Sequence, residues 1–413
     1  MAYTPVAGFS YSALHVGLKK KRLDLALIAA EKPAACAAIF TQNAVVAAPV
    51  IVAQEHAQSG YTRGFVVNAG NANACTGARG LADAHAVTQA TAAALGCAST
   101  DILCASTGVI GVDLPVEKIT NALPELAAQA DQTPESVQKV AEAIMTTDTF
   151  AKTAEATFIY DNTTYTVAGL AKGSGMIAPN MATMIGAVLS DAPFTPDVCD
   201  TLLRMAAAHT FNAVTVDGDT STNDTLIFMA SGEAGGALID SKAHPAFEAA
   251  LAAVFSVCEK LALSIAFDGE GATKHVDVVV TGASNCADAS CMARTIAQSP
   301  LVKTALFGND ANWGRVAAAA GRSGVAFSPD SLSITFAGIA VCVNGAAVSF
   351  DEDEALVALK QEHVAIHVDL GQSHDASNDY KSAFTPHPHE GSARILTCDL
   401  TYDYVRINGE YRS

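Results

Sequence analysis

The sequence lacks the patterns that most directly indicate a metal site, a nucleotide site or a serine-hydrolase site. No pair among its ten cysteines forms Cys-x-x-Cys, and the nearest pair, Cys286 and Cys291, has no paired histidine motif. His387 and His389 are separated by proline in a loop-like stretch, so no metal site is expected. A Gly-x-Ser-x-Gly turn and a Gly-x-x-x-x-Gly-Lys loop are both missing, which leaves a serine triad or a Walker-type nucleotide site without an anchor.

Basic residues are scarce. Lysine and arginine number 24 against 42 acidic residues, which gives a formal net charge of −18. A chain this acidic repels phosphate backbones, so nucleic acid is not an expected partner. The charge mainly favours solubility, and a site for an anionic substrate must carry its own cations.

Long apolar runs are also missing. No run reaches the roughly 18 residues that a membrane-spanning helix needs, and the first residues show no basic segment followed by a long apolar core. Scattered cysteines without such a leader favour a reducing cytoplasm. What the sequence does have is a hydrophobic content of 50% over 413 residues, enough for a large core and more than one lobe.

Apolar periodicity predicts an α/β (α+β) protein whose mixed sheets are covered by helices. Many connections are too short for a pure βαβ series. Thr133-Pro134 and Thr195-Pro196 are expected to start helices, Gly96 to end one, and Asp161-Asn162 to turn a hairpin. Strands are expected at 23–30, 64–70, 101–111, 184–190, 275–282, 363–371 and 394–408, and helices at 78–96, 195–208 and 244–267.

The stretch AKGSGMIAPNMATM, which starts at Ala171, holds the most unusual loop. One interpretation is an ordinary glycine and proline loop before a buried strand. The other is a loop that presents one peptide bond to a hydroxyl: the Oγ of Thr183 can attack the carbonyl of Ala182. Cleavage would leave a threonine whose own α-amine can act as its base, a known way to activate a nucleophile.

Three further stretches carry groups suited to a site. Ala105–Gly111 follows a strand and can aim a backbone N–H at one point, as an oxyanion hole requires. Phe267–Lys274 (FDGEGATK) could recognise a zwitterion through Glu270 and Lys274. Gly308–Arg315 holds the only tryptophan beside several polar groups, which suits the wall of a site or an interface. The alternatives are an ordinary turn for the first stretch, a solvated charged loop for the second and a structural role for the third.

Together these motifs resemble the ornithine acetyltransferase family, the glutamate N-acetyltransferases of arginine biosynthesis. The similarity covers essentially the whole chain. It includes GLKKKRLDLALI, FTQNAVVAAPV, VVNAGNANACTG, STGVIG, MTTDT, FDGEGATK, GNDANWGR and YDYVRINGEYRS.

The resemblance implies self-cleavage between Ala182 and Thr183 into chains 1–182 and 183–413. Thr183 would be the nucleophile, and Thr107 and Gly108 would form the oxyanion hole. The implied substrate contacts are Thr149, Lys172, Thr183, Glu270, Asn408 and Ser413. Thr146 and Thr147 stand beside Thr149 and remain alternatives to it, Ser413 replaces the threonine common in the family, and the charges at 19–22 are expected to be solvated.

The family fold is a layered sandwich of sheets and helices related to the DmpA amidases. The resemblance implies no bound cofactor, N-acetylornithine and glutamate as substrates, and an α2β2 heterotetramer of cleaved chains in the cytoplasm. Acetyl-CoA is a possible second acetyl donor, and no residue in the sequence indicates whether the protein uses it. A self-processed aminopeptidase or amidase, with water as the acyl acceptor, and a non-enzymatic small-ligand-binding protein are the rival hypotheses.

Overall fold

The computed structural model describes residues 4–178, 184–371 and 385–410. Contacts divide the chain into two units, which are described separately below. The first unit holds Met1–Asn212 and Asp219–Leu261, and the second holds Ala213–Gly218 and Ala262–Ser413.

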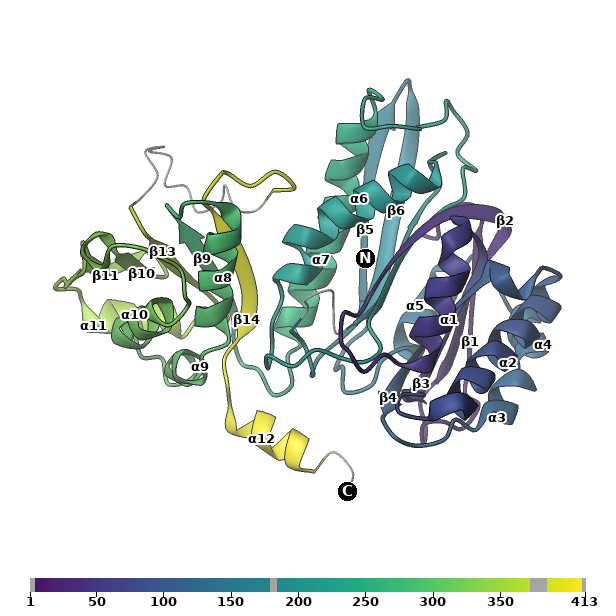
Figure 1. Ribbon diagram of the computed structural model, residues 1–413, viewed down its shortest axis with the longest axis horizontal. Coiled ribbons are helices and arrows are strands. Elements are labelled where there is room, and N and C mark those ends of the chain that lie inside the picture. The colour runs from purple at the N-terminus through teal and green to yellow at the C-terminus, as the bar shows by residue number, and fades with distance from the viewer. Residues whose placement is uncertain (1–3, 179–183, 372–384, 411–413) are drawn as a thin grey trace. The chain divides into compact units, whose positions relative to one another are not determined.

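The first unit is built on an eight-stranded mixed sheet (Figure 1). Its order is β4-β3-β2-β8-β7-β6-β5, with β1 paired to β2. The β3·β4 and β7·β8 pairs are parallel and the others antiparallel. The strands are β1 (Phe9–Leu14), β2 (Leu25–Phe40), β3 (Tyr61–Asn71), β4 (Ile102–Val109), β5 (Lys152–Tyr160), β6 (Thr163–Lys172), β7 (Ile185–Ser190) and β8 (Thr225–Ala230).

Helices flank this sheet. They are α1 (Ala48–His56), α2 (Gly77–Leu95), α3 (Val116–Thr120), α4 (Leu123–Ala128), α5 (Pro134–Ala143), α6 (Pro196–His209) and α7 (Phe247–Phe267), with short 3-10 turns η1 (Ala57–Ser59), η2 (Ser99–Asp101) and η3 (Phe211–Ala213).

Successive side chains of β2 point to opposite faces of the sheet, and Leu25 to Ala30 are buried on both faces. Leu25 and Leu27 join a core with residues of α1, α2, α3 and α4. Ala26 and Ile28 join a second core with residues of α5 and β1. Both faces of the sheet are therefore covered, as the predicted layered α/β class requires.

The second unit has a six-stranded mixed sheet in the order β12-β11-β10-β13-β9-β14. Its strands are β9 (His275–Thr281), β10 (Ser333–Phe336), β11 (Ile339–Val343), β12 (Ala346–Ala347), β13 (His363–Asp369) and β14 (Ala393–Cys398). Its helical elements are α8 (Cys286–Ala297), α9 (Pro300–Phe307), α10 (Trp313–Gly321), η4 (Pro329–Ser331), α11 (Glu352–Leu359) and α12 (Tyr402–Gly409).

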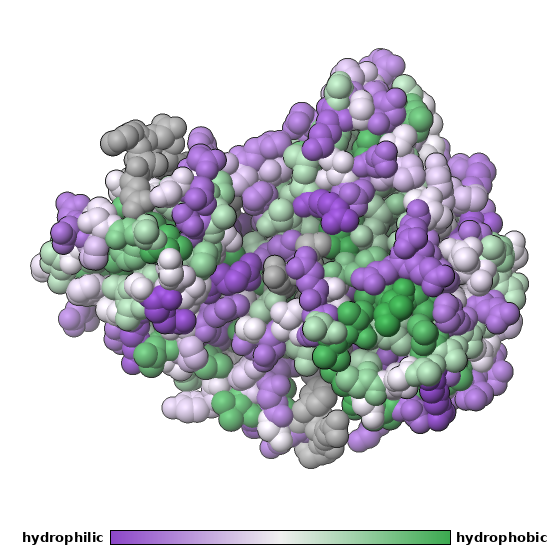
Figure 2. All heavy atoms as spheres, viewed as in Figure 1, coloured by the Kyte–Doolittle hydropathy of each residue, from purple (hydrophilic) through white to green (hydrophobic). Residues whose placement is uncertain are grey.

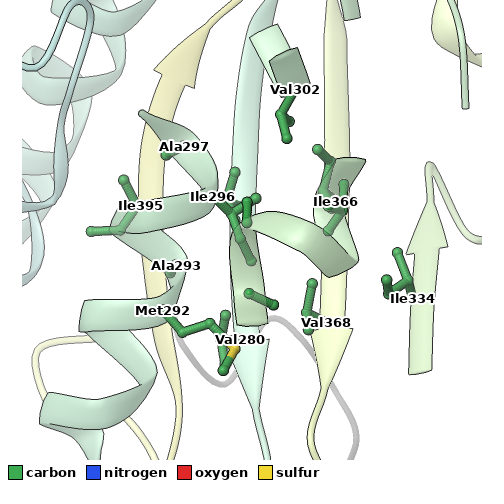
Figure 3. Close-up of a cluster of buried hydrophobic side chains, with 14 of the residues drawn as sticks. Val280, Met292, Ala293, Ile296, Ala297, Val302, Ile334, Ile366, Val368 and Ile395 are labelled. Atoms are coloured by element: carbon green, nitrogen blue, oxygen red, sulfur yellow. The ribbon is translucent and has the colours of Figure 1, made fainter. Parts of the chain in front are cut away.

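Figure 3 shows the core of the second unit, where one face of α8 lies over the sheet. Met292 and Ile296 of α8 pack in one buried cluster with Val280 of β9, Ile366 of β13 and Ile395 of β14. The apolar residues of α8 recur at helical spacing, and Val276, Val278 and Val280 alternate along β9, so each element presents one face to this cluster.

Helix and turn signals in the sequence are confirmed at several ends. The side chains of Thr133 and Thr195 cap α5 and α6, each followed by proline. Gly96 ends α2 in the left-handed region at φ 67°. Asp161 and Asn162 turn the β5–β6 hairpin, both with positive φ.

The predicted strand at 394–408 is right only in its first part. β14 ends at Cys398, and Tyr402–Gly409 forms α12. The side chain of Thr401 accepts a hydrogen bond from the backbone N–H of Tyr404 at 3.2 Å. This N-cap starts a helix, and the alternating pattern of the sequence did not reveal it.

Among the residues that the structure describes, α7 has the length and apolar composition of a membrane-spanning helix. The sequence analysis did not anticipate this. Leu251, Val254 and Val257 of α7 are nevertheless fully buried in the protein, which is the environment of a core helix.

The largest apolar region on the face seen in Figure 2 lies over the first unit. Hydrophobic atoms gather there over α1. Val45, just before α1, and Ile51, within it, expose 51% and 44% of their surface. Large exposed apolar patches often mark interaction sites.

Candidate active site

The predicted oxyanion-hole residues lie at the end of β4, where it runs parallel to β3. Thr107 pairs with Ala69, and Gly108 pairs with Gly70. Gly108 has φ +133°, and a Cβ placed on it would lie 2.3 Å from the carbonyl carbon of Gly70. Only glycine fits so close a backbone approach. Thr107 and Gly108 are both half-buried, so part of each residue is accessible to solvent.

Hydrogen bonds that involve buried asparagine side chains fix the backbone of this turn. The Asn223 side chain donates to the carbonyl oxygens of Ala72 at 2.6 Å and Ser106 at 2.9 Å. The Ser106 hydroxyl donates to Asn68 at 2.6 Å. Satisfied buried networks of this kind rigidify the backbone they hold, and rigid donors are what an oxyanion hole needs.

Lys172 ends β6 with its side chain only 9% exposed. Its Nζ donates to the Thr146 hydroxyl at 2.8 Å and lies 3.8 Å from Asp148. Of the three threonines that the sequence could not separate, Thr146 therefore lies against the lysine. Thr147 is half-buried and Thr149 is exposed.

Asp148 organises this corner, although sequence reasoning did not single it out. Its buried carboxylate accepts from Lys152 Nζ at 2.8 Å, from the Gly173 N–H at 2.6 Å and from the Thr146 N–H at 2.9 Å. Burial raises the pKa of Asp148, but the charges of Lys172 and Lys152 outweigh it and hold that pKa well below its usual range. Asp148 is thus an anion that fixes the loop and the lysine together.

The expectation that the charged residues at 19–22 are solvated is wrong for Lys19. Its Nζ donates to the carbonyl oxygens of Leu23 and Ala143, each at 2.8 Å. Burial is the main cause that lowers the pKa of Lys19, to about 8. The expectation of solvation holds for Lys20, Lys21 and Arg22, which are exposed.

The second unit contains the other predicted substrate contacts. The Asn408 amide of α12 donates to Glu270 Oε2 at 2.8 Å. Glu270 is 8% exposed, so the FDGEGATK segment is not a solvated charged loop. Thr401 donates to the Gly271 carbonyl at 2.7 Å, and this bond ties the loop to the start of α12.

Ala182, Thr183 and Ser413 lie outside the described residues. The strands on either side of the predicted cleavage point are described. Lys172 of β6 pairs with Ile185 of β7, and Ile185 pairs with Thr225 of β8. The Met184 carbonyl accepts from the Thr225 N–H at 3.0 Å. The start of β7 is therefore fixed between two strands.

Other sequence candidates have structural roles here. The Asn312 side chain caps α10, and Arg315 donates to the Leu301 carbonyl at 2.8 Å. These contacts favour the structural interpretation of Gly308–Arg315.

Among the described residues, one cluster has residue types that could bind a metal: His275, Asp277 and His363. The centroids of the two imidazole rings lie 4.6 Å apart with only 11° between the ring planes, so their lone pairs lie in separate, nearly parallel planes, which does not favour one ion bound by both. Arg394 already contacts Asp277 at 3.0 Å. The geometry favours a buried acid neutralised by its neighbours.

Replacing Gly108 with alanine tests the close approach of β3 and β4. The new Cβ would overlap the Gly70 backbone, so we expect a loss of about 1–3 kcal/mol of unfolding free energy and weaker oxyanion stabilisation. Gly111→Ala is the matched control, because Gly111 also has positive φ but has open space around it. Urea denaturation of both variants measures the difference, and equal losses would contradict the steric account.

Replacing Asp148 with asparagine tests the central anion of the corner. It leaves Lys152 buried without its charge partner, so we expect a loss of about 3–5 kcal/mol in urea denaturation. The double variant Asp148→Asn/Lys152→Met removes both charges and should recover part of that loss. No recovery would contradict a role for charge.

The pH dependence of stability has a defined sign. The folded-state pKa of Asp148 is lowered relative to an unfolded value of about 3.9. Its stabilisation is therefore fully present above that value and is lost as the pH falls below it. The midpoint temperature of thermal unfolding should fall more steeply between neutral and acid pH for the wild type than for Asp148→Asn.

Comparison with known proteins gives a match along nearly the whole chain. Residues 10–413 match the profile of the ArgJ family. "Arginine biosynthesis bifunctional protein ArgJ" of Geobacter sulfurreducens is 45% identical over 99% of this chain and 100% of its own length. The protein of the same name from Chlorobaculum tepidum is 43% identical over 98% of this chain and 96% of its own. A crystal structure of ArgJ from Bacillus halodurans is 39% identical and covers 55% of this chain and 98% of its own, with a TM-score of 0.49.

Proposed function

Since this chain belongs to the ArgJ family, we propose that it cleaves itself and moves an acetyl group from N-acetylornithine to glutamate. Family membership confirms the predicted resemblance and the predicted enzyme class, an acetyltransferase of arginine biosynthesis. The substrates, the cleavage and the residue roles below are the proposal.

Self-cleavage begins when the Oγ of Thr183 attacks the carbonyl carbon of Ala182. The peptide nitrogen leaves as the α-amine of Thr183, and water then hydrolyses the ester that joins the two chains. The products are chains 1–182 and 183–413. The freed amine lies on the same residue as the hydroxyl, so it can take the hydroxyl's proton in the next reaction.

Acetyl transfer follows a ping-pong course. Thr183 Oγ attacks the acetyl carbonyl of N-acetylornithine, and the negative charge develops on an oxygen facing Thr107 and Gly108. One well-placed donor is worth on the order of 10²–10³ in rate. The α-amine passes its proton to ornithine, which leaves. Glutamate then takes the acetyl group from Thr183 and regenerates the hydroxyl.

The proposed substrate contacts divide by charge. Lys172 offers a cation to a substrate carboxylate, with Thr149 contributing a hydroxyl. Glu270 offers a carboxylate to a substrate ammonium group, supported by the Asn408 amide. Thr183 contacts the acetyl group, and Ser413 adds a second hydroxyl. Both substrates are α-amino acid derivatives, so each of these contacts can serve in both half-reactions.

One observation supports this assignment more than any other. The three-residue segment Asn223–Thr225 binds both the oxyanion turn and the start of β7. Asn223 donates to Ser106, the residue before Thr107, and Thr225 donates to Met184, the residue after Thr183. The residue before the proposed oxyanion donor Thr107 and the residue after the proposed nucleophile Thr183 are thus both hydrogen-bonded to the same three-residue segment.

The proposal includes acetyl-CoA as a second acetyl donor, with no resident cofactor, and an α2β2 assembly. Exposed Val45 and Ile51 give such an assembly an apolar surface. All ten cysteines are free thiols, which supports a reducing compartment such as the cytoplasm.

Two assays test the proposed function. A denaturing gel should show two chains for the wild type and one full-length chain of 42.3 kDa for Thr183→Ala. The purified wild type should form N-acetylglutamate from N-acetylornithine and glutamate faster than it hydrolyses N-acetylornithine. Dominant hydrolysis would favour the amidase alternative, and an uncleaved wild type would overturn the mechanism.

Cleavage should not release the two chains under native conditions. β7 and β8 of chain 183–413 lie in the sheet between β2 and β6 of chain 1–182. Separation would break two strand ladders inside a buried sheet. Native size-exclusion chromatography should therefore show one peak containing both chains, and denaturant should separate them. Separate native peaks would contradict the shared sheet.

A further inference from the structure

Lys19 is a half-buried cation that the proposed mechanism leaves unused. Its Nζ donates to the carbonyl oxygens of Leu23 and Ala143, each at 2.8 Å. An ammonium group has three N–H donors, and the third has no acceptor among the residues that the structure describes. One donor of this ammonium group is therefore available to a ligand.

A buried acid fixes the loop that presents Lys19. The carboxylate of Asp24 is fully buried and accepts hydrogen bonds from the successive backbone N–H groups of residues 16 to 19, at distances between 2.6 and 3.1 Å. The Asp24 carbonyl accepts from the Ala69 N–H of β3 at 2.9 Å. Successive N–H groups that converge on one anion form a concave nest. These bonds hold the backbone of Lys19 beside β3.

The side chain of Lys19 connects the two parts of the candidate site that the first unit contains. Its Cγ would lie 3.3 Å from a Cβ placed on Gly70, the residue that pairs with Gly108 in the oxyanion turn. Its ammonium group binds Ala143, which ends α5 shortly before Thr146. The Thr146 hydroxyl is the group that accepts from Lys172 Nζ.

Four charges act on Lys19. Asp24 and Asp148 favour its ammonium form, and Arg22 and Lys172 oppose it. Burial has the largest effect and lowers the pKa of Lys19 to about 8, so most molecules carry the charge at neutral pH. Among the described residues, no carboxylate forms an ion pair with Lys19. This part of the first unit therefore has two ammonium groups, Lys19 and Lys172, that can attract carboxylates.

We infer that Lys19 determines the specificity for the acetyl acceptor: its unused N–H binds the second carboxylate, which glutamate has and ornithine lacks. The inference rests on the proposed function, in which Lys172 binds one carboxylate of either substrate. A second carboxylate needs a donor of its own when it leaves water. Lys152 does not supply it, because its side chain is fully buried and its Nζ is bound to Asp148.

Such a contact would favour glutamate over glutamine, whose side chain has the same shape but no charge. A site built around one hydrogen-bonding group discriminates against an analogue that lacks it. N-acetylornithine has no second carboxylate, so the first half-reaction does not use the contact. A purely structural role of Lys19 would instead affect both half-reactions and both acceptors alike.

Lys19→Met is the test, and Lys118→Met is its matched control. Methionine keeps an apolar stem beside Gly70 but has no charge and no donor. Lys118 also donates to a carbonyl of this loop, that of Gly17 at 2.9 Å, but its side chain is exposed. Acetylation of the enzyme by N-acetylornithine, and transfer from the acetylated enzyme to glutamate and to glutamine, are measured separately for both variants and the wild type.

For Lys19→Met we expect self-cleavage as in the wild type and a rate of enzyme acetylation within about threefold of it. The kcat/KM for glutamate should fall roughly 10- to 100-fold through a higher KM, as the loss of one charge-assisted hydrogen bond predicts. The kcat/KM for glutamine should stay within about threefold, so the preference for glutamate falls. Lys118→Met should keep the wild-type values.

An equal loss in both half-reactions, or an unchanged preference for glutamate over glutamine, would overturn the inference while leaving the proposed function intact. A wild type that forms no N-acetylglutamate would instead overturn the proposed function. If Lys19→Met does not fold, Lys19→Gln is measured in its place. Failure of both variants to fold would show a purely structural role and overturn the inference as well.

Discussion

Backbone pairing at the start of β7 is the constraint on which the site depends. Met184 is bound to Thr225 on one side, and Ile185 pairs with Lys172 on the other. The start of β7 is therefore fixed between β6 and β8. Parallel pairing of β7 with β8 also brings Asn223 beside the oxyanion turn.

Local charge balance at this point differs from that of the whole chain. The protein carries 18 more acidic than basic residues, yet its candidate site holds Lys172 and Lys152 around one buried anion, Asp148. Asp148 holds Lys172 at 3.8 Å, so the lysine is oriented without being neutralised by a close ion pair. A fixed, partly unpaired cation in a buried corner is a good partner for a carboxylate arriving from solution.

The sequence was most informative where a local rule decides the structure. The caps at Thr133 and Thr195 and the stop at Gly96 depend on a few neighbouring residues, and all three are confirmed. The helix after Thr401 was missed because its alternating pattern is equally typical of a strand.

The candidate site was predicted through resemblance more than through local physics. From the sequence alone, Gly108 is an ordinary turn residue. Glycine is necessary there because the backbone of Gly70 lies too close for a Cβ. Asp148 could not be identified from the sequence. It is buried because β5 pairs with β6, which brings Lys152, Lys172 and Gly173 around its carboxylate. The sequence pattern does not show that these groups meet.

The central claim is that Thr183 carries the acetyl group between the two substrates. Intact mass spectrometry after incubation with N-acetylornithine, without glutamate, tests it most directly. The account predicts that chain 183–413 gains the mass of one acetyl group, located on Thr183 by peptide fragmentation, and that added glutamate removes it. A chain that turns over both substrates but never gains the acetyl group would contradict the account.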